Sequence, residues 1–206
     1  MIVVRSAPVV ADVCDVVART VDTPRPARLV YVTDAVSVTP EAAVNVSVSV
    51  SDVVEVDASG QEEVIVGIAS APALARRWAA AKGHGATVNE KKISVSKVAS
   101  LTDASISYSD FVGWGDRLEP FQKMLASAWR TRGIGDFWSH MLVAEGAVDV
   151  AIEPSLALWD MAALDIIVRE AGGSFSNTAG QSGPFGGSGV STNGVLHNQV
   201  IKELNP

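Results

Sequence analysis

The sequence predicts an α/β fold, an α+β layered sandwich in which helices pack against sheets. From Val64 onward, short apolar strands alternate with helices whose apolar residues recur at helical spacing, and this alternation is typical of layered α/β architecture. The chain has 206 residues, of which 48% are hydrophobic, which is enough to bury a core. Its mean hydropathy of +0.25 excludes wholesale disorder.

Residues 1–57 differ in composition from the rest of the chain. About a third of them are Val, and they include no Lys, Phe or Trp. Between Val44 and Val50, Val alternates with polar residues, which predicts a strand with one apolar face. We therefore expect an atypical Val-rich segment over 1–57 and the domain proper over 58–206. One hypothesis for this composition is an out-of-frame or replaced segment of a GC-rich gene.

The apolar run 64–69 predicts a buried strand, which can pair with residues 44–56 as a hairpin across 58–60. Residues 72–78 predict a short irregular or helical piece. His84, between two glycines, is either a ligand or a turn residue, and the turn is the simpler interpretation. Further strands are expected at 93–96, 105–108, 148–152, 174–176 and 190–193, further helices at 117–129, 137–145 and 195–204, and a glycine-rich loop at 177–189. Asp136 is a candidate N-cap of the helix 137–145, and His197 is expected on the surface.

The stretch 158–170 predicts the helix around which the rest of the chain is organised. Ala162, Ala163, Ile166 and Ile167 recur at helical spacing, and the glycine pair that follows this stretch supplies a left-handed helix end. Asp160 then falls in the first turn, where free backbone N–H groups and the helix dipole favour anions such as phosphate. A carboxylate there either complements the dipole or holds a metal ion against a bound phosphate.

Charge and cysteine content exclude several classes of function. The formal net charge of −7 argues against nucleic acid as a partner. No apolar run reaches the roughly 18 residues that a membrane span needs, so we expect no membrane insertion. The single Cys14 has no partner for an internal disulfide, which suits a reducing cytoplasm.

The segment Trp-Asp-Met-Ala-Ala at 159–163, followed by Glu-Ala-Gly-Gly at 170–173, resembles the C-terminal signature of the inositol monophosphatase family. The run from Gly67 to Ser96 resembles the same family's pattern of strand, Gly-x-Gly-Ala, Asn and strand. The resemblance implies an α/β/α/β/α architecture, here N-terminally incomplete, and a Mg²⁺-dependent, lithium-sensitive phosphomonoesterase. It also implies that Asp160 is a metal ligand and that the protein is a homodimer.

The segment Arg-Thr-Arg-Gly-Ile-Gly-Asp-Phe-Trp at 130–138 resembles the histidinol-phosphatase branch of the family, found in histidine biosynthesis. The resemblance places the substrate's organic part against Gly135, Asp136 and Glu153. Two acidic residues suit a cationic amino alcohol better than a neutral polyol. Read without the resemblance, Asp136 is an N-cap and Glu153 an ordinary loop carboxylate. The implied partner is a small phosphorylated metabolite, either histidinol phosphate or an inositol phosphate.

The metal motifs of the family's N-terminal half are missing from this sequence. No Asp-Pro-x-Asp-Gly-Thr occurs in the sequence. Gly-Gln-Glu-Glu at 60–63 faintly resembles the family's Glu-Glu loop, but an exposed hairpin turn is the simpler interpretation of it. Mg²⁺ is held by several oxygen ligands, so one carboxylate predicts weak binding. The first alternative is therefore a catalytically inactive relic or interaction module. The enzyme alternatives are an inositol-1-monophosphatase and, more distantly, a nucleotide or sugar bisphosphatase.

Overall fold

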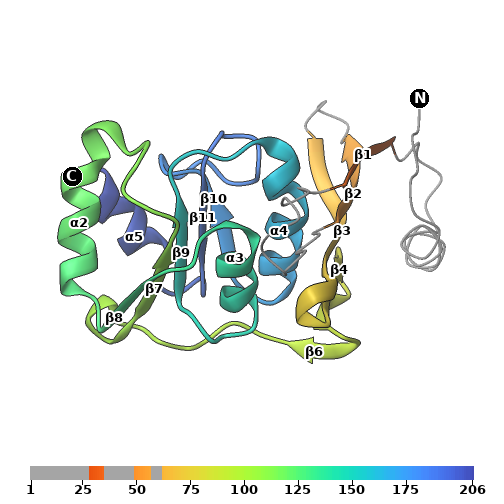
Figure 1. Ribbon diagram of the computed structural model, residues 1–206, viewed down its shortest axis with the longest axis horizontal. Coiled ribbons are helices and arrows are strands. Elements are labelled where there is room, and N and C mark those ends of the chain that lie inside the picture. The colour runs from red at the N-terminus through yellow and green to blue at the C-terminus, as the bar shows by residue number, and fades with distance from the viewer. Residues whose placement is uncertain (1–27, 35–48, 57–61) are drawn as a thin grey trace, which may run out of the picture.

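The structure is a computed structural model that describes residues 28–34, 49–56 and 62–206. Two β-sheets, A and B, face each other across a layer of helices (Figure 1). Cys14 and most of the Val-rich segment lie outside the described residues.

Sheet A has six antiparallel strands that follow one another in chain order. Val53 of β2 lies opposite Val66 of β3, which confirms the expected pairing of these two stretches, although the connection 57–61 lies outside the described residues. The Val-rich segment therefore contributes two strands to the same sheet as the domain proper. The strands are β1 (Arg28–Asp34), β2 (Ser49–Val56), β3 (Glu62–Ala71), β4 (Arg76–Ala81), β5 (Gly85–Val88) and β6 (Lys91–Ile93).

Sheet B has five strands in the order β10-β11-β9-β7-β8. Strand β7 is parallel to both of its neighbours, β8 and β9, whereas β9, β11 and β10 are antiparallel to one another. The strands are β7 (Ser105–Tyr108), β8 (Arg130–Gly133), β9 (Val150–Glu153), β10 (Ser174–Ser176) and β11 (Gly189–Thr192).

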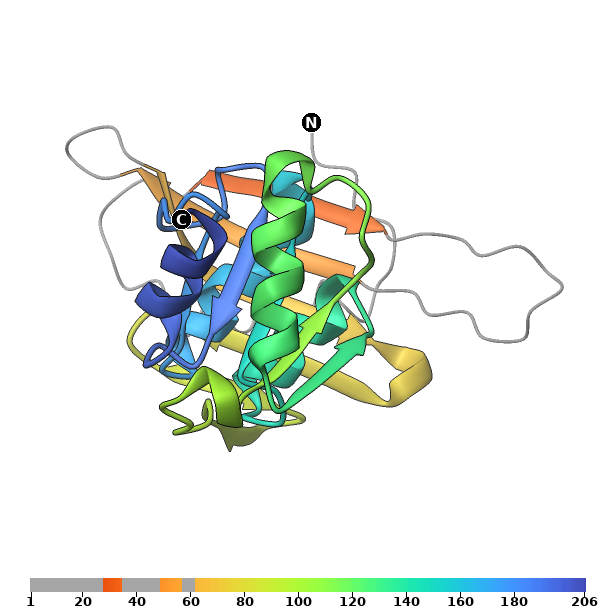
Figure 2. The same cartoon turned by 90° about the vertical axis from the view of Figure 1, so that its left-hand side faces the viewer.

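The helices form two layers, one between the sheets and one outside sheet B. Figure 1 shows α3 and α4 between the sheets, and Figure 2 shows α2 and α5 in front of sheet B. The described order of layers, α/β/α/β, confirms the layered fold class, and no described helix supplies a further layer outside sheet A. No described helix has the length and apolarity needed to cross a bilayer. The helices are α2 (Leu118–Ser127), α3 (Asp136–Ala144), α4 (Leu158–Glu170) and α5 (His197–Leu204).

Helix α4 is the centre of the larger hydrophobic core, as its periodicity predicts. Its residues from Met161 to Val168 are all buried, and they pack with Trp78, Phe175 and residues of sheet A. A second core joins sheet B to α2 and α5. Burial on almost every side explains why apolar residues fill most positions of α4.

Gly67 lets α4 approach β3 closely. A Cβ at this position would lie 2.4 Å from Ile166 Cγ2 and 2.8 Å from the Ala163 Cα, and a helix backbone cannot move away as a flexible side chain can. We expect Gly67→Ala to lower the free energy of unfolding by about 1–3 kcal/mol through overpacking, measured by urea denaturation. Gly133→Ala is the matched control, because its Cβ would meet nothing closer than 3.5 Å. Equal stability of the two variants would contradict the close approach.

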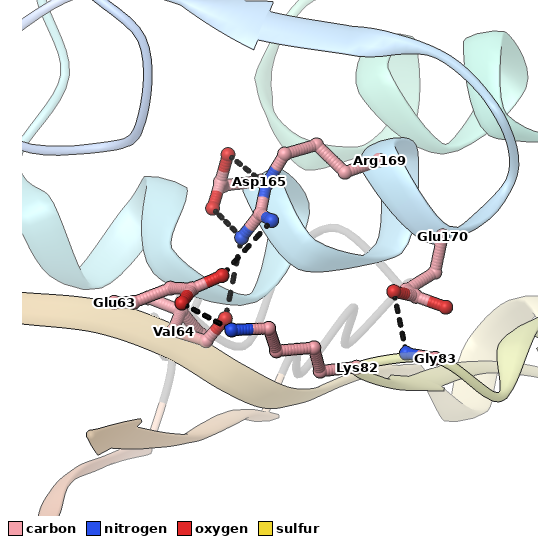
Figure 3. Close-up of polar contacts among 7 residues, drawn as sticks. All are labelled: Glu63, Val64, Lys82, Gly83, Asp165, Arg169 and Glu170. Atoms are coloured by element: carbon pink, nitrogen blue, oxygen red, sulfur yellow. Dashed lines mark hydrogen bonds and ion pairs between the residues drawn. The ribbon is translucent and has the colours of Figure 1, made fainter. Parts of the chain in front are cut away.

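The C-terminal end of α4 is attached to the turn between β4 and β5. The Glu170 carboxylate accepts backbone N–H bonds from Gly83 at 2.9 Å and from Gly85 at 2.8 Å, and the first of these is drawn in Figure 3. His84 lies exposed in this turn, which agrees with the interpretation of His84 as a turn residue.

Four element predictions need correction. Strand β4 contains Trp78, which we expected in an irregular piece, and only the short 3₁₀ turn Pro72–Leu74 is irregular there. The strand expected at 93–96 ends at Ile93. Strand β8 was not predicted, because its exposed Arg and Gly residues show no apolar alternation. His197 is half-buried rather than on the surface, with Nδ1 3.1 Å from the Thr192 hydroxyl, and burial lowers its pKa.

Candidate active site

The candidate site lies where two neighbouring strands of sheet B end. Strands β7 and β9 are parallel, with Tyr108 opposite Ile152, so the residues that follow them meet at one edge of the sheet. Ser109 and Asp110 follow β7, and Glu153 is the last residue of β9. Ligands of open α/β sheets bind outside the carboxyl ends of such strands.

Glu153 is a buried carboxylate with two hydrogen-bond donors. Only 3% of its surface is exposed. Its Oε1 accepts the backbone N–H of Asp136 at 2.9 Å, and the Ser109 side chain forms a second hydrogen bond. Burial raises the pKa of Glu153, and the neighbouring Asp136 and Asp110 carboxylates raise it further, although both hydrogen bonds act in the opposite direction.

Gly135 and Asp136 form the turn that enters α3. Gly135 has a φ of +74°, and a Cβ there would lie 2.9 Å from the Ser109 Cα, so both the backbone conformation and the close approach require glycine. Gly135 is also the N-cap of α3, which begins at Asp136. The expectation that Asp136 is the N-cap is therefore wrong by one residue. The exposed Asp136 instead uses its backbone N–H to hold Glu153.

Asp160 lies in the first turn of α4 and is exposed, as its position in the sequence predicts. Its Oδ2 accepts the Ala157 backbone N–H at 3.3 Å, which satisfies one free donor at the helix start. Partial burial raises the pKa of Asp160, the hydrogen bond lowers it, and the Asp136 carboxylate raises it. Asp136 therefore interacts electrostatically with both Asp160 and Glu153, and Asp110 interacts with Glu153.

These residues do not fit a complete Mg²⁺ site. Mg²⁺ prefers octahedral oxygen coordination with carboxylates that converge on one point. Within residues 63–206, no group of three or more His, Cys, Asp or Glu side chains is arranged to hold a metal ion. Asp160 remains the single residue of this region for which the resemblance implies metal binding.

Sequence reasoning missed several polar residues near this edge of sheet B. Ser109 and Asp110 could have been found, because both strands were expected to end here and parallel neighbours bring such ends together. His140 carries no comparable signal. It is fully buried on α3, its Nδ1 lies 2.7 Å from the Ser191 hydroxyl, and its Nε2 has no hydrogen-bond partner in the described part of the chain. Burial lowers the pKa of His140 to about 4.

Comparison with known proteins identifies the lineage of the chain. The model of the inositol monophosphatase family matches residues 39–205, a range that begins inside the Val-rich segment. The chain is 51% identical over 147 residues to the histidinol-phosphatase of Mycobacterium tuberculosis, covering 68% of this chain and 56% of the relative. It is 46% identical over 153 residues to the histidinol-phosphatase of Streptomyces coelicolor, covering 71% of this chain and 58% of the relative.

A solved structure shows the same relationship. The IMPase of Thermotoga maritima superimposes with a TM-score of 0.67 at 30% identity, covering 77% of this chain and 61% of that one. This chain spans just over half the length of the two histidinol-phosphatases that it matches. On the family match, the sequence identity and the shared fold together, this chain belongs to the inositol monophosphatase family.

Proposed function

We propose that the chain acts on histidinol phosphate, as a Mg²⁺-dependent phosphomonoesterase of the cytoplasm that forms a homodimer. The observation that carries this proposal is the position of Glu153, a buried carboxylate held by the Asp136 N–H at the carboxyl end of β9. A buried acid with further acids nearby favours a ligand with a cationic group. The similarity to two histidinol-phosphatases supports the same substrate.

We assign roles to the named residues on the basis of the family resemblance. Glu153 and Asp136 bind and orient the amino alcohol part of the substrate, and Gly135 permits the turn that brings the Asp136 N–H to Glu153. The start of α4 attracts the phosphate through its free N–H groups, and Asp160 is the proposed metal ligand beside it. These assignments concern substrate binding only, because the side chains of residues 63–206 do not form a complete Mg²⁺ site.

The second candidate is a protein that binds the substrate without turning it over. The observation that favours it is the missing convergence of metal-binding side chains in residues 63–206, together with the absence of Asp-Pro-x-Asp-Gly-Thr from the sequence. An inositol-1-monophosphatase is the remaining enzyme candidate. It differs from the proposed histidinol-phosphatase in the substrate that it hydrolyses.

Phosphate release from histidinol phosphate over a range of Mg²⁺ concentrations tests the proposal. We expect Mg²⁺-dependent release that Asp160→Asn abolishes. Glu153→Gln removes a buried charge without changing shape, and we expect it to weaken substrate binding by about tenfold or more, since charge-assisted hydrogen bonds contribute about 1.5–3 kcal/mol. Glu203→Gln, an exposed carboxylate on α5, is the matched control and should leave both quantities unchanged.

Two outcomes would contradict the proposal in different ways. No release at any Mg²⁺ concentration, with calorimetric binding of histidinol phosphate retained, would establish the second candidate. Faster phosphate release from inositol 1-phosphate than from histidinol phosphate would show that the proposed substrate is wrong. The assignment to the inositol monophosphatase family would still hold.

A further inference from the structure

Glu153 is a buried carboxyl group without a cationic partner. Among the described residues, no ion pair joins it to an Arg, Lys or His side chain. The charged groups that act on it are Asp136 of α3 and Asp110 of the loop after β7, and both are acidic. A buried carboxylate in such surroundings stays ionised only where hydrogen-bond donors stabilise its charge. The charge of Glu153 therefore depends on its two donors, the Asp136 backbone N–H and the Ser109 side chain.

The two donors differ in what fixes them. The Asp136 N–H belongs to the backbone at the start of α3, so almost any residue at this position supplies it. The Ser109 donor is a side-chain hydroxyl, so it depends on the identity of one residue. Since an ionised carboxylate only accepts hydrogen bonds, the hydroxyl donates to Glu153 and favours its charged form.

Ser109 packs tightly against the turn that enters α3. A Cβ on Gly135 would lie 2.9 Å from the Ser109 Cα, 3.0 Å from the Ser109 Cβ and 3.6 Å from Glu153 Oε1. The end of β7, the turn before α3 and the end of β9 therefore meet at one point. On its other side, a Cβ on Gly133 would lie 3.5 Å from the Ser109 carbonyl oxygen. Such close neighbours leave the Ser109 backbone little freedom to move.

The loop that follows Ser109 is also fixed. The Asp110 Oδ1 accepts the backbone N–H of Val112 at 2.7 Å, and the Asp110 carbonyl oxygen accepts the indole N–H of Trp114 at 3.0 Å. The loop then returns to the segment that carries Glu153, because a Cβ on Gly113 would lie 3.6 Å from the Pro154 Cγ. The loop after β7 and the end of β9 thus support each other, which holds the hydroxyl in a constant position relative to the carboxylate.

We propose that Ser109 is a positioning residue for substrate binding, whose hydroxyl orients the Glu153 carboxylate and keeps it ionised for contact with the organic part of the substrate. Ser109 acts through Glu153 and does not itself need to touch the substrate. An ionised carboxylate accepts hydrogen bonds from ammonium and from hydroxyl donors, so this role does not depend on the charge of the organic part. The inference rests on the proposed function, because it concerns the way in which Glu153 binds that substrate.

Calorimetric binding of histidinol phosphate to the full chain without Mg²⁺, over a series of pH values, tests this role separately from turnover. We expect Ser109→Ala to weaken binding at neutral pH by about threefold to tenfold, because the carboxylate loses a hydrogen bond to its charged form. Loss of this donor also raises the pKa of Glu153. Binding by the variant should therefore begin to fall at a higher pH than binding by the native chain as the solution is acidified. The ligand's own titration is the same in both measurements and does not affect their difference.

Three further variants separate positioning from a merely structural role. Ser109→Thr keeps the hydroxyl and should restore both the affinity and the pH profile. Ser109→Ala made in the Glu153→Gln background should have little further effect, since two residues that act as a unit are not additive. Ser127→Ala is the matched control, because it removes a hydroxyl that donates to the Met124 carbonyl oxygen at 2.7 Å at the end of α2, in the layer outside sheet B.

Several results would overturn the inference. One is an equal loss of affinity on Ser109→Ala in the native and the Glu153→Gln backgrounds, which would show that Ser109 acts independently of Glu153. Another is a Thr variant that binds as weakly as the Ala variant at every pH. Binding of histidinol phosphate that Ser109→Ala leaves unchanged would remove this inference alone and leave the proposed function standing. No binding by the native chain would overturn both.

Discussion

Replacing Asp165 with Ala lowers the free energy of unfolding by about 3–5 kcal/mol, the expected loss when one partner of a buried ion pair is removed. Asp165 is 1% exposed in the middle of α4. Its two oxygens accept a fork of hydrogen bonds from Arg169, from Nε at 2.9 Å and from Nη2 at 2.7 Å. The same Nη2 donates to the Val64 carbonyl oxygen of β3 at 3.2 Å. The pair therefore joins helix α4 to sheet A (Figure 3).

The loss in Asp165→Ala arises because the Arg169 guanidinium keeps its charge in a half-buried position without its main partner. Burial raises the pKa of Asp165 more than the hydrogen bonds and charge of Arg169 lower it. Burial therefore disfavours the charged form of Asp165, and removal of one member of the pair leaves the other without compensation. Urea denaturation at neutral pH measures the difference between the variant and the native chain.

The same network contains a matched control. Lys82 and Glu63 form an ion pair in which both side chains are more than a third exposed. We expect Lys82→Met to change stability by about 0–1 kcal/mol, because solvent screens such pairs. An equal loss of unfolding free energy in Lys82→Met and Asp165→Ala would contradict the view that solvent exposure makes the Lys82–Glu63 pair weaker than the Asp165–Arg169 pair.

His140 makes the stability of the native chain fall as the pH falls from about 6.5 to about 4. Its pKa is about 4 in the folded protein, against 6.5 for an ordinary histidine. Within this window the unfolded chain binds a proton that the folded protein does not, so protonation favours unfolding. The gap between the two pKa values corresponds to about 3 kcal/mol. Below about pH 4 the contribution of His140 no longer changes.

Denaturation at a series of pH values checks this expectation against His140→Phe, which keeps an aromatic ring beside Phe175. The variant removes the titrating group and should reduce the slope of stability against pH between 4 and 6.5. His84→Gln is the control, because His84 is exposed in the turn between β4 and β5 and its replacement removes a histidine without changing a buried site. A slope that is equal in His140→Phe and the native chain would show that His140 does not titrate in this window.

The sequence predicts the central elements well because each has one strong local signal. Helix α4 has a helical repeat of apolar residues and a glycine pair at its end, and β3 has a continuous apolar run. Strand β8 has neither, because it lies at an exposed edge where Arg and Gly face solvent and pairing with β7 alone defines it. The strand β4 is built largely from Ala and Arg around Trp78, and its neighbours in the sheet determine its conformation.

The candidate site was harder to predict from the residues themselves. Asp160 is placed by the helix pattern, but its role comes only from the resemblance. Glu153 was expected at the end of a strand, yet its hydrogen bonds come from Ser109 and from the backbone of Asp136, which are distant in sequence. The contact between Arg169 and Val64 spans 105 residues, and no local pattern encodes such a contact.

The hydrogen bonds from Gly83 and Gly85 to Glu170 show that one residue of the family signature has a structural role. Within the stretch 159–173, the resemblance implies metal binding for Asp160 alone. Glu170 accepts hydrogen bonds from the turn between β4 and β5. The alanines and isoleucines between these two residues pack in the core against sheet A. Most of the signature therefore specifies how two sheets are joined through one helix. A polypeptide can retain this stretch for the sake of its architecture alone, so the presence of the signature identifies ancestry and cannot by itself establish turnover.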